Sequence, residues 1–326
     1  MRLRPGKQKT AGVLLSASAL CVIAAVAGCV SGTARVQRGP KPAPTAAESP
    51  AQTETTRLRL PGMLGPVAGP GEVTELVPGG EVDWSGQTVS ARGTGLLDPG
   101  ATEKERALSA AERAATVVAR RNLLEILKGI PADPDVTVGG LPKGDAVLRD
   151  RIERLIKEAQ PAGPTKYDST AGTVTVELQV PLYNGGLADA LVQEPPQTVS
   201  DSPSVAVRRF LERNSSLVLD GTGTGLKPSL FPRVYDSKGA VLLDTRMYVG
   251  FFNADTGGIR FVNSLEALSK RNPAGPPLVV SVQETCGALG TGMILDAQNS
   301  NRLKSLKEDF GYLVTTGRIL FRVSPE

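Results

Sequence analysis

A run of alternating glycine and threonine is the sequence feature closest to a ligand-binding motif. Gly221-Thr222-Gly223-Thr224-Gly225 follows a predicted strand at Leu217–Leu219, which is where phosphate-binding loops occur. Such loops open a helix, whose free N-terminal amides bind the anion. Here Pro228 and Pro232 follow too soon for a helix, and Lys227 precedes a proline instead of the serine or threonine of a Walker motif. The run therefore predicts a turn with positive φ angles.

Three aspartates near this run could meet across neighbouring strands: Asp220, Asp236 and Asp244. A glycosidase needs two carboxylates at a defined separation, and sequence spacing does not define one. The spacing of Asp220 and Asp244 fits no EF-hand calcium loop. Aspartates beside glycine-rich loops ordinarily form turns, and we expect that role here.

The chain of 326 residues contains no histidine. This excludes a Ser–His–acid triad, a histidine general base and a zinc site that uses histidine. Cys286 would have no histidine to activate it, so a small, partly buried side chain is expected. No Gly-x-Ser-x-Gly nucleophile motif is present. We expect a protein that is not an enzyme and uses neither cofactor nor metal; a hydrolase without histidine is the weakest alternative.

The first 28 residues have the anatomy of a secretory signal peptide. Four basic residues and no acid precede an uncharged apolar run at residues 11–28. The basic residues are Arg2, Arg4, Lys7 and Lys9. The alternative, a membrane span, would be short for a hydrocarbon core of roughly 30 Å.

The end of this segment, Val26-Ala27-Gly28-Cys29, resembles the bacterial lipobox. In lipobox proteins a diacylglycerol is attached to the cysteine, the preceding peptide bond is cut and the new N-terminus is acylated. The resemblance implies palmitate-type acylation at Cys29, with Val26, Ala27 and Gly28 read by the signal peptidase. Val30 follows the cysteine, in place of the aspartate associated with inner-membrane retention. This implies an outer-membrane protein that faces the periplasm or is exposed at the surface.

Removal of the signal changes the charge balance. The chain has 37 basic and 33 acidic residues, and loss of the four basic residues leaves 33 of each. A neutral mature chain gives no argument for nucleic acid, which requires a clustered basic face. Cys21 would leave with the signal, so the mature chain would form no intramolecular disulfide.

The composition predicts a tether and two folded segments after residue 28. Residues 29–73 contain seven prolines and no aromatic residue, so they bury too little apolar area to offset the entropy of ordering. Residues 74–193 and 201–326 each combine helical and strand patterns. The predicted fold class is α+β, with two small two-layer α/β-sandwich domains.

The first segment shows the clearest periodicities. We predict a strand over 82–97, a helix from a Thr102–Glu105 capping box to Lys128 with Gly129 as its stop, and a short strand at 136–138. A second helix at 145–159 and strands at 165–168 and 173–183 follow. Val174, Val176, Leu178 and Val180 alternate with polar residues, which predicts a strand with one apolar face. Both helices are expected on that face.

The second segment is predicted from shorter patterns. Helices are expected from Ser202-Pro203 to Phe210 and over 264–270 and 301–310. Strands are expected over 217–219, 241–243, 247–249, 278–282 and 319–323.

Several features of the first segment fit one known family. They are Gly93-Thr94-Gly95, the Ala-rich helix through Ala107, Ala111, Ala115 and Ala119, Arg120 to Leu124, the second amphipathic helix and the closing strand Val174–Val180. Residues 84–183 thereby resemble the Lpp-twenty family of bacterial outer-membrane lipoproteins. That family's domain is similar to the N-terminal domain of the flagellar protein FlgT. The resemblance implies a structural or assembly role in the cell envelope, since flagellar relatives help to build rings around the motor.

Two hypotheses for function follow. The first is a non-enzymatic envelope lipoprotein that acts through protein–protein contacts, including self-association, and is held to the membrane by its lipid. The alternative is a periplasmic protein that binds peptidoglycan or another glycan by stacking sugars on Trp84, Tyr167 or Tyr183. The sparse aromatic residues count against this alternative, and Trp84 is expected to be a core or sheet-edge side chain.

Overall fold

The computed structural model describes residues 71–141, 145–192, 199–200, 202–252, 258–266, 275–307 and 310–324. Over these residues the fold is α+β, as the sequence predicts. The predicted signal peptide and all of the predicted tether up to residue 70 lie outside the described residues. All of the described residues belong to one compact unit.

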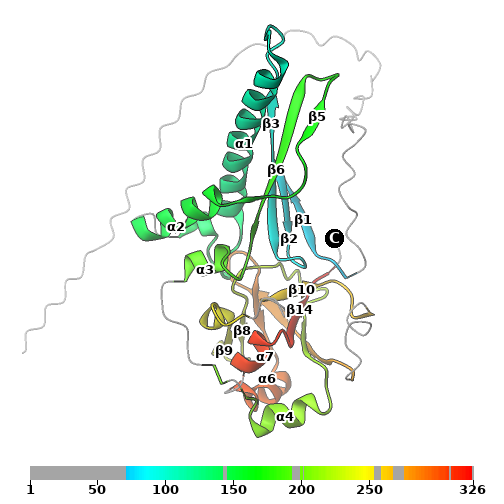
Figure 1. Cartoon of the computed structure of the whole chain (residues 1–326). Coiled ribbons are helices and arrows are strands. Elements are labelled where there is room, and N and C mark those ends of the chain that lie inside the picture. The colour runs from blue at the N-terminus through cyan, green and yellow to red at the C-terminus, as the bar shows by residue number, and fades with distance from the viewer. Residues whose placement is uncertain are drawn as a thin grey trace, which may run out of the picture. The chain divides into compact units, whose positions relative to one another are not determined.

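The first segment is built on a six-stranded antiparallel sheet (Figure 1). Its strands are β1 (Thr74–Val77), β2 (Gly80–Asp83), β3 (Thr88–Leu96), β4 (Gln160–Pro161), β5 (Lys166–Asp168) and β6 (Thr173–Pro181). The order is β1-β2-β3-β6-β4, and β5 also pairs with β6. The two long strands, β3 and β6, are paired over their whole length.

The predicted single strand over 82–97 is wrong, because the chain turns between β2 and β3. Asp83 Oδ1 accepts hydrogen bonds from the backbone amides of Ser85 and Gly86, at 3.0 and 2.7 Å. Gln87 then adopts a left-handed φ of 59°. An aspartate that bonds the amides two and three residues ahead stabilises a turn, so the strand becomes a hairpin.

The long helix α1 (Lys104–Gly129) covers one face of β3 and β6. Its buried side chains confirm an Ala-rich stripe. The sequence periodicity predicts that stripe through Leu108, Ala111, Ala115, Val118 and Asn122, but Val118 is exposed and Leu108 and Asn122 are only partly buried. The buried residues are Ala107, Ala111, Ala115, Ala119, Leu123, Ile126 and Leu127. The predicted capping box is wrong, since the N-cap is Glu103 and no side chain caps the helix. Gly129 ends the helix without the left-handed φ of a glycine stop.

The second helix, α2 (Ala146–Lys157), is where the sequence places it, and Asp145 caps it by accepting from the Leu148 amide. It packs against α1 and α3 (Leu187–Leu191) instead of the sheet, so the expectation of two helices on one sheet face is wrong. The predicted strand at 136–138 is instead a single bridge, Pro131 to Thr137, followed by the 3₁₀ helix η1 (Val138–Gly140).

The second segment has two four-stranded sheets. The first is entirely parallel, with strands β10 (Arg260–Val262), β14 (Ile319–Arg322), β7 (Leu217–Asp220) and β11 (Leu278–Ser281) in that order. Consecutive residues of β7 and β14 are buried, as expected for a parallel sheet covered on both faces. The second sheet has the order β12 (Glu284–Cys286), β13 (Gly292–Ile294), β8 (Arg233–Tyr235) and β9 (Val241–Asp244).

The helices of this segment depart from the sequence expectations. α4 (Val205–Leu211) is capped by Ser204, so Pro203 lies before the cap and not inside the helix. The predicted strand at 247–249 lies mostly in the 3₁₀ helix η2 (Thr245–Tyr248). In place of one helix over 301–310 there are two, α6 (Ala297–Lys304) and α7 (Phe310–Thr315). The predicted helix over 264–270 lies mostly outside the described residues.

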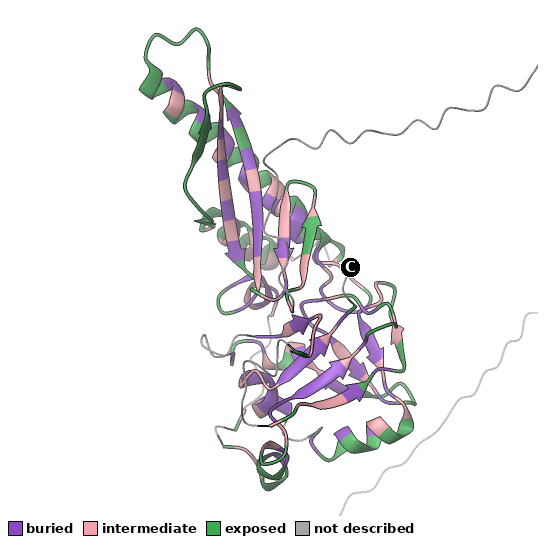
Figure 2. Cartoon of the chain, turned by 90° about the vertical axis from the view of Figure 1, so that its right-hand side faces the viewer, coloured by how far each residue is buried: buried purple, intermediate pink, exposed green. Residues whose placement is uncertain are grey.

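One hydrophobic core contains residues from both segments. The Trp84 ring packs edge-on against Phe261 with centroids 5.7 Å apart, and Phe261 contacts Phe321 of β14. The hydroxyl of the buried Tyr183 donates to the Leu230 carbonyl at 2.8 Å. The burial pattern is drawn in Figure 2. Buried and intermediate residues alternate along β6 until its exposed last residue, whereas β3 has three consecutive buried residues, Val89 to Ala91, and exposed Thr94 and Leu96.

Candidate functional site

The residues predicted to carry the lipid, Val26, Ala27, Gly28 and Cys29, lie outside the described residues. Every other candidate from the sequence has a defined place. None of the helices in the described ranges is both long and apolar enough to cross a membrane. Over the same ranges, no three Cys, Asp or Glu side chains gather closely enough to hold a metal ion.

The three aspartates engage three different cations instead of one another. Asp220 pairs with Arg322 at 3.0 Å, Asp236 with Lys304 at 3.0 Å and Asp244 with Arg233 at 2.8 Å. Each also accepts a backbone amide from a residue two positions ahead. This confirms the expected turn-forming role and gives no pair of carboxylates arranged around a shared substrate.

The glycine run behaves as the turn that the sequence predicts. Gly223 and Gly225 have φ angles of 78° and 75°. The Asp220 carboxylate accepts from the Thr222 amide and hydroxyl, and Ser324 Oγ accepts from the Gly223 amide. Burial alone would raise the pKa of Asp220, but the Thr222 hydrogen bonds and the Arg322 charge outweigh it and lower that pKa. The loop amides are thus used by the chain's own oxygens.

The aromatic residues proposed as sugar-stacking faces divide into two groups. Trp84 and Tyr183 are only 1% and 2% exposed, so neither offers a ring face to a ligand. Burial also raises the pKa of Tyr183 well above its ordinary value. Tyr167 is 45% exposed, and the ammonium of Lys104 lies 5.9 Å from its ring centroid. The core interpretation of Trp84 is confirmed.

Cys286 is a free, partly buried thiol in β12. Burial raises its pKa, and the nearby carboxylates of Asp135 and Glu284 raise it further. A thiol with a raised pKa is a poor nucleophile, which agrees with the expectation for this residue.

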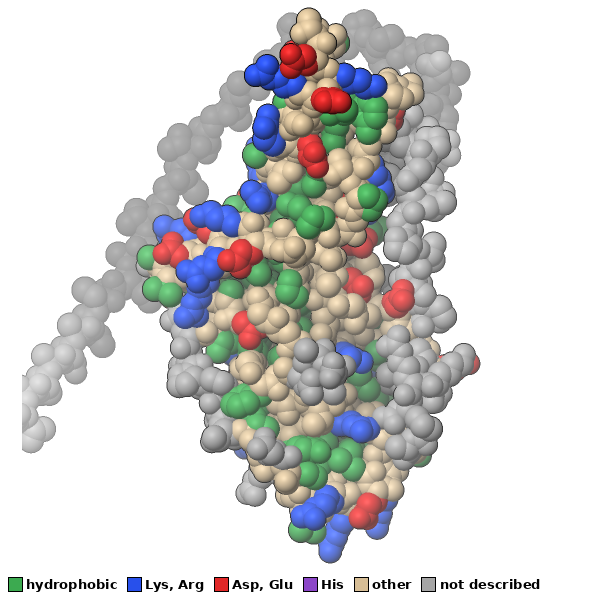
Figure 3. All heavy atoms as spheres, viewed as in Figure 1, with side chains coloured by type: hydrophobic (Ala, Val, Ile, Leu, Met, Phe, Trp, Pro, Cys, Tyr) green, Lys and Arg blue, Asp and Glu red, His purple; other side chains and the backbone are tan. Residues whose placement is uncertain are grey.

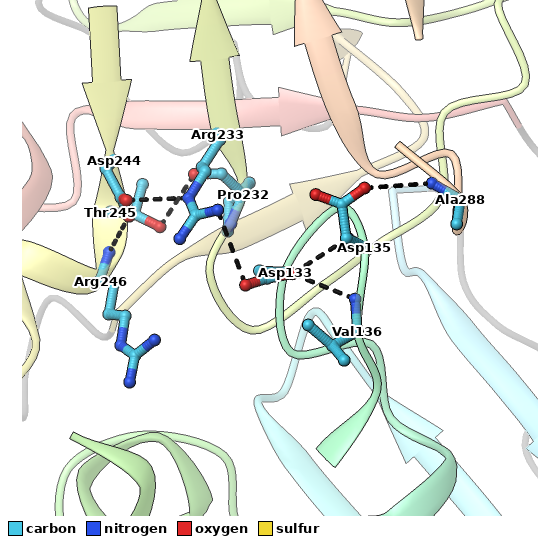
Figure 4. Close-up of polar contacts among 9 residues, drawn as sticks. All are labelled: Asp133, Asp135, Val136, Pro232, Arg233, Asp244, Thr245, Arg246 and Ala288. Carbon is cyan, nitrogen blue, oxygen red and sulfur yellow. Dashed lines mark hydrogen bonds and ion pairs between the residues drawn. The ribbon is translucent and has the colours of Figure 1, made fainter. Parts of the chain in front are cut away.

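A loop of the first segment docks into the second segment at a cluster that the sequence did not reveal. Arg233 of β8 lies between Asp244, with Nε 2.8 Å from Oδ2, and Asp133, with Nη1 3.6 Å from Oδ2 (Figure 4). Burial opposes the charge of Arg233, but the two carboxylates outweigh it and raise the pKa of the guanidinium. We call these three residues the junction cluster.

Backbone hydrogen bonds surround the junction cluster. The Leu230 and Phe231 amides donate to the carbonyls of Pro131 and Ala132, each at 2.9 Å, and the Leu289 amide donates to Pro134. Asp133 Oδ1 accepts from the amides of Asp135 and Val136, which closes the turn (Figure 4). The Asp-Pro-Asp sequence could have indicated this turn, but nothing local indicates its partner Arg233. With its guanidinium committed to two carboxylates, the cluster positions the segments instead of performing chemistry.

Among the described helices, α1 is the one that packs extensively on β3 and β6, and we call the sheet face opposite α1 the open face. Residues directly opposite one another in antiparallel strands share a face, so the register defines it. On β3 and β6 it consists of Ser90, Arg92, Thr94, Leu96, Thr173, Thr175, Glu177 and Gln179. Arg92 pairs with Glu177 at 3.0 Å across the strands. The open face is therefore a largely polar surface, with Ser90 buried near one end.

The exposed side of α2 offers no comparable surface. Acidic and basic side chains alternate over it, as the mixed colours at the end of α2 in Figure 3 show. The salt bridge between Lys157 and Glu153 is long, at 3.9 Å, and exposed. This is the pattern of a solvated helix.

Comparison with known proteins informs the second segment. No curated protein matches the chain. The matching family model begins at residue 216, so the Lpp-twenty resemblance of residues 84–183 stays a prediction. Residues 216–324 match the family model described as the second domain of Treponema pallidum Tp0624, and the C-terminal domain of this chain is similar to that domain.

Proposed function

We propose that this chain is a non-enzymatic, lipid-anchored envelope protein that acts as a structural or assembly factor through protein–protein contacts. The anchor is Cys29, residues 30–73 serve as its tether, and the location is the outer membrane. Two or three acyl chains, at roughly 0.8 kcal/mol per buried methylene, would hold it there firmly. Involvement in flagellar or other envelope machinery is part of this proposal and rests on the Lpp-twenty resemblance.

The open face is the observation that carries the proposal. A sheet in a stable domain usually has one face against the core, and its other face is either solvated or used for contacts. Here α1 covers one face of β3 and β6, and the residues on the opposite face are mostly polar. Ser90 is buried, and the other residues of this face are partly or fully exposed. Glu177 accepts a hydrogen bond from Arg92 within the open face, and Gln179 lies at one end of it, opposite Ser90.

The close packing of α1 on β3 supports the Lpp-twenty part of the proposal. Gly93 and Gly95 lie against the alanines of α1, at the residues that carry the resemblance. The similarity of residues 216–324 to a domain of another bacterial protein adds no activity to the proposal.

Light scattering of the mature, lipid-free chain tests self-association through the open face. The whole chain is used because the two segments share one core. Gln179→Arg places a charge on the open face and is expected to change the assembly size while the circular dichroism spectrum stays the same. Val117→Arg is the matched control, since Val117 lies on α1 and is exposed. A monomer at every concentration, with both variants like the parent, would remove the open face as a self-contact.

The alternative is glycan binding. Two of the three residues proposed to stack on sugars, Trp84 and Tyr183, are buried in the core. Tyr167 is the one that remains exposed. Titration with soluble muropeptides separates the two functions. Binding that depends on Tyr167 would favour glycan binding, and the absence of muropeptide binding would favour the assembly role.

A further inference from the structure

The strand β1 is an outer edge of the six-stranded sheet, and β2 is its one partner in the described ranges. The Trp84 amide donates to the Val73 carbonyl at 2.9 Å, which fixes the phase of the antiparallel ladder. Since bonded and non-bonded pairs alternate, Glu75 and Val77 direct their backbone groups to β2. Thr74 and Leu76 then direct their amides and carbonyls outward, away from the sheet.

A hollow of about 290 Å³ lies beside this edge, on the α1 side of the sheet. It is mainly apolar, and it is lined by Glu75, Val77, Pro78, Val82, Trp84, Glu125, Ile126, Gly129, Ile130 and Pro131. On the other side of the sheet Leu76 is 79% exposed. A strand added along β1 would therefore place every second side chain in the hollow and the others beside Leu76.

Charge selects the kind of strand that fits. Residues 71–91 contain four acidic residues and no basic residue. Glu75 and Glu125 lie at the hollow, and Glu81 is directly opposite Leu76 on the other side. A second copy of β1 would bring like charges together, which destabilises cross-strand pairs. The β1 edge also lacks the features that usually protect edge strands from pairing with another chain, because β1 contains no lysine and no bulge. It carries an exposed leucine, Leu76.

We propose that the β1 edge binds an extended segment of a partner protein in which apolar residues alternate with lysine or arginine. The segment adds a strand to the sheet through the backbone of Thr74 and Leu76. Its apolar side chains enter the hollow, and its basic side chains lie on the other side near Glu81. The inference rests on the proposed role in protein–protein contacts and names the partner surface for it.

The test uses fluorescent peptides and the mature, lipid-free chain. A peptide in which leucine alternates with arginine should bind, as measured by fluorescence anisotropy. A peptide of alternating leucine and glutamate should not, and neither should one of the same leucine and arginine content arranged in two blocks. Binding should weaken as salt rises, because exposed charges are screened. Glu81→Gln, on the side of the basic side chains, should reduce that salt dependence, and Glu75→Gln, on the side of the hollow, should reduce it less.

Two pairs of variants separate the hollow from the edge. A Cβ at Gly129 would meet nothing within 4 Å, and the backbone there is not left-handed, so Gly129→Leu can fill the hollow. Gly129→Ala is its control. Leu76→Pro removes the outward amide without breaking the ladder to β2, and Leu76→Thr keeps that amide. For Gly129→Leu and Leu76→Pro we expect the peptide affinity to fall at least about tenfold, one decade in Kd. For the controls, Gly129→Ala and Leu76→Thr, we expect a change of less than about twofold.

Hydrogen exchange on the unmodified chain gives an independent readout. Peptide binding should slow exchange of the Thr74 and Leu76 amides and leave the Glu75 amide, already bonded to β2, unchanged. Equal binding of all three peptides, absence of binding, or a dimer of the parent that Leu76→Pro abolishes would overturn the proposal. Gln179→Arg should leave peptide binding intact. Failure of open-face self-association together with intact peptide binding would therefore reject the open-face contact and retain this edge site.

Discussion

Gly93 of β3 lies so close to α1 that a Cβ added to it would stand 2.1 Å from the carbonyl oxygen of Ala115. A Cβ added to Gly95 would likewise stand 2.0 Å from the carbonyl oxygen of Ala111. Since the obstacle is helix backbone, a side chain here must push the helix from the sheet. We expect Gly93→Ala to lower the free energy of unfolding by about 1–3 kcal/mol, the range for overpacked cores. Urea denaturation measures it, with Gly163→Ala as the control because a Cβ there meets nothing.

Replacement of Arg233 should loosen the docking of the two segments. Arg233→Met leaves Asp133 and Asp244 without their cation, and all three side chains are largely buried. An unsatisfied buried polar group costs about 1–3 kcal/mol, and we expect a loss of unfolding free energy in that range. Lys157→Met, which removes only an exposed ion pair, should change it by less than about 1 kcal/mol. Equal effects of the two variants would contradict a structural role for the junction cluster.

Asp236 should make the free energy of unfolding depend on pH in the acidic range. Its hydrogen bond to Lys304, together with those from the Ala240 and Lys238 amides, lowers its pKa to about 2. The unfolded chain has the higher pKa, about 3.9, and so binds the proton first. The stabilisation is therefore complete above that pKa and is lost as the pH falls from about 4 to about 2. Thermal melting between pH 7 and pH 2 should show a steeper acid loss for the parent than for Asp236→Asn.

The lipid anchor can be tested in cells. Cys29→Ser should abolish metabolic labelling with palmitate and release or misprocess the protein, because the acyl chains supply the membrane affinity. Fractionation should place the parent in the outer membrane. Unlabelled parent protein, or a retained and uncut signal segment, would contradict the prediction.

The tether predicts a pattern of proteolysis. Cleavage is expected between about Ala34 and Gly71, because a segment with little burial opens readily. The resistant fragment should begin near Glu72, since Asn263 accepts from the Gly71 amide and donates to the Glu72 carbonyl. Mass spectrometry of the fragments decides it. Protection of residues 34–71 as a whole would rule out a tether that holds the domain away from the membrane.

Local patterns in the sequence predicted the features that depend on near neighbours. Alternation from Val174 to Val180 predicted β6 and its buried face, because side chains alternate across a strand. The alanines of α1 predicted close approach to a sheet, although not the exact stripe. The glycine run and its aspartate predicted a turn, since positive φ and Asx bonding are properties of a few adjacent residues.

Tertiary structure decided what depends on residues far apart in the chain. The strand pattern over 82–97 is interrupted at Trp84, whose ring packs on Phe261 of the other segment. Arg233 meets Asp133 only because the loop after α1 docks beside β8. The outward amides of β1 and its hollow likewise depend on which strand pairs with β2 and where α1 ends. Spacing along the sequence determines which side chains share a face, whereas the partner of that face is selected by packing over the whole chain.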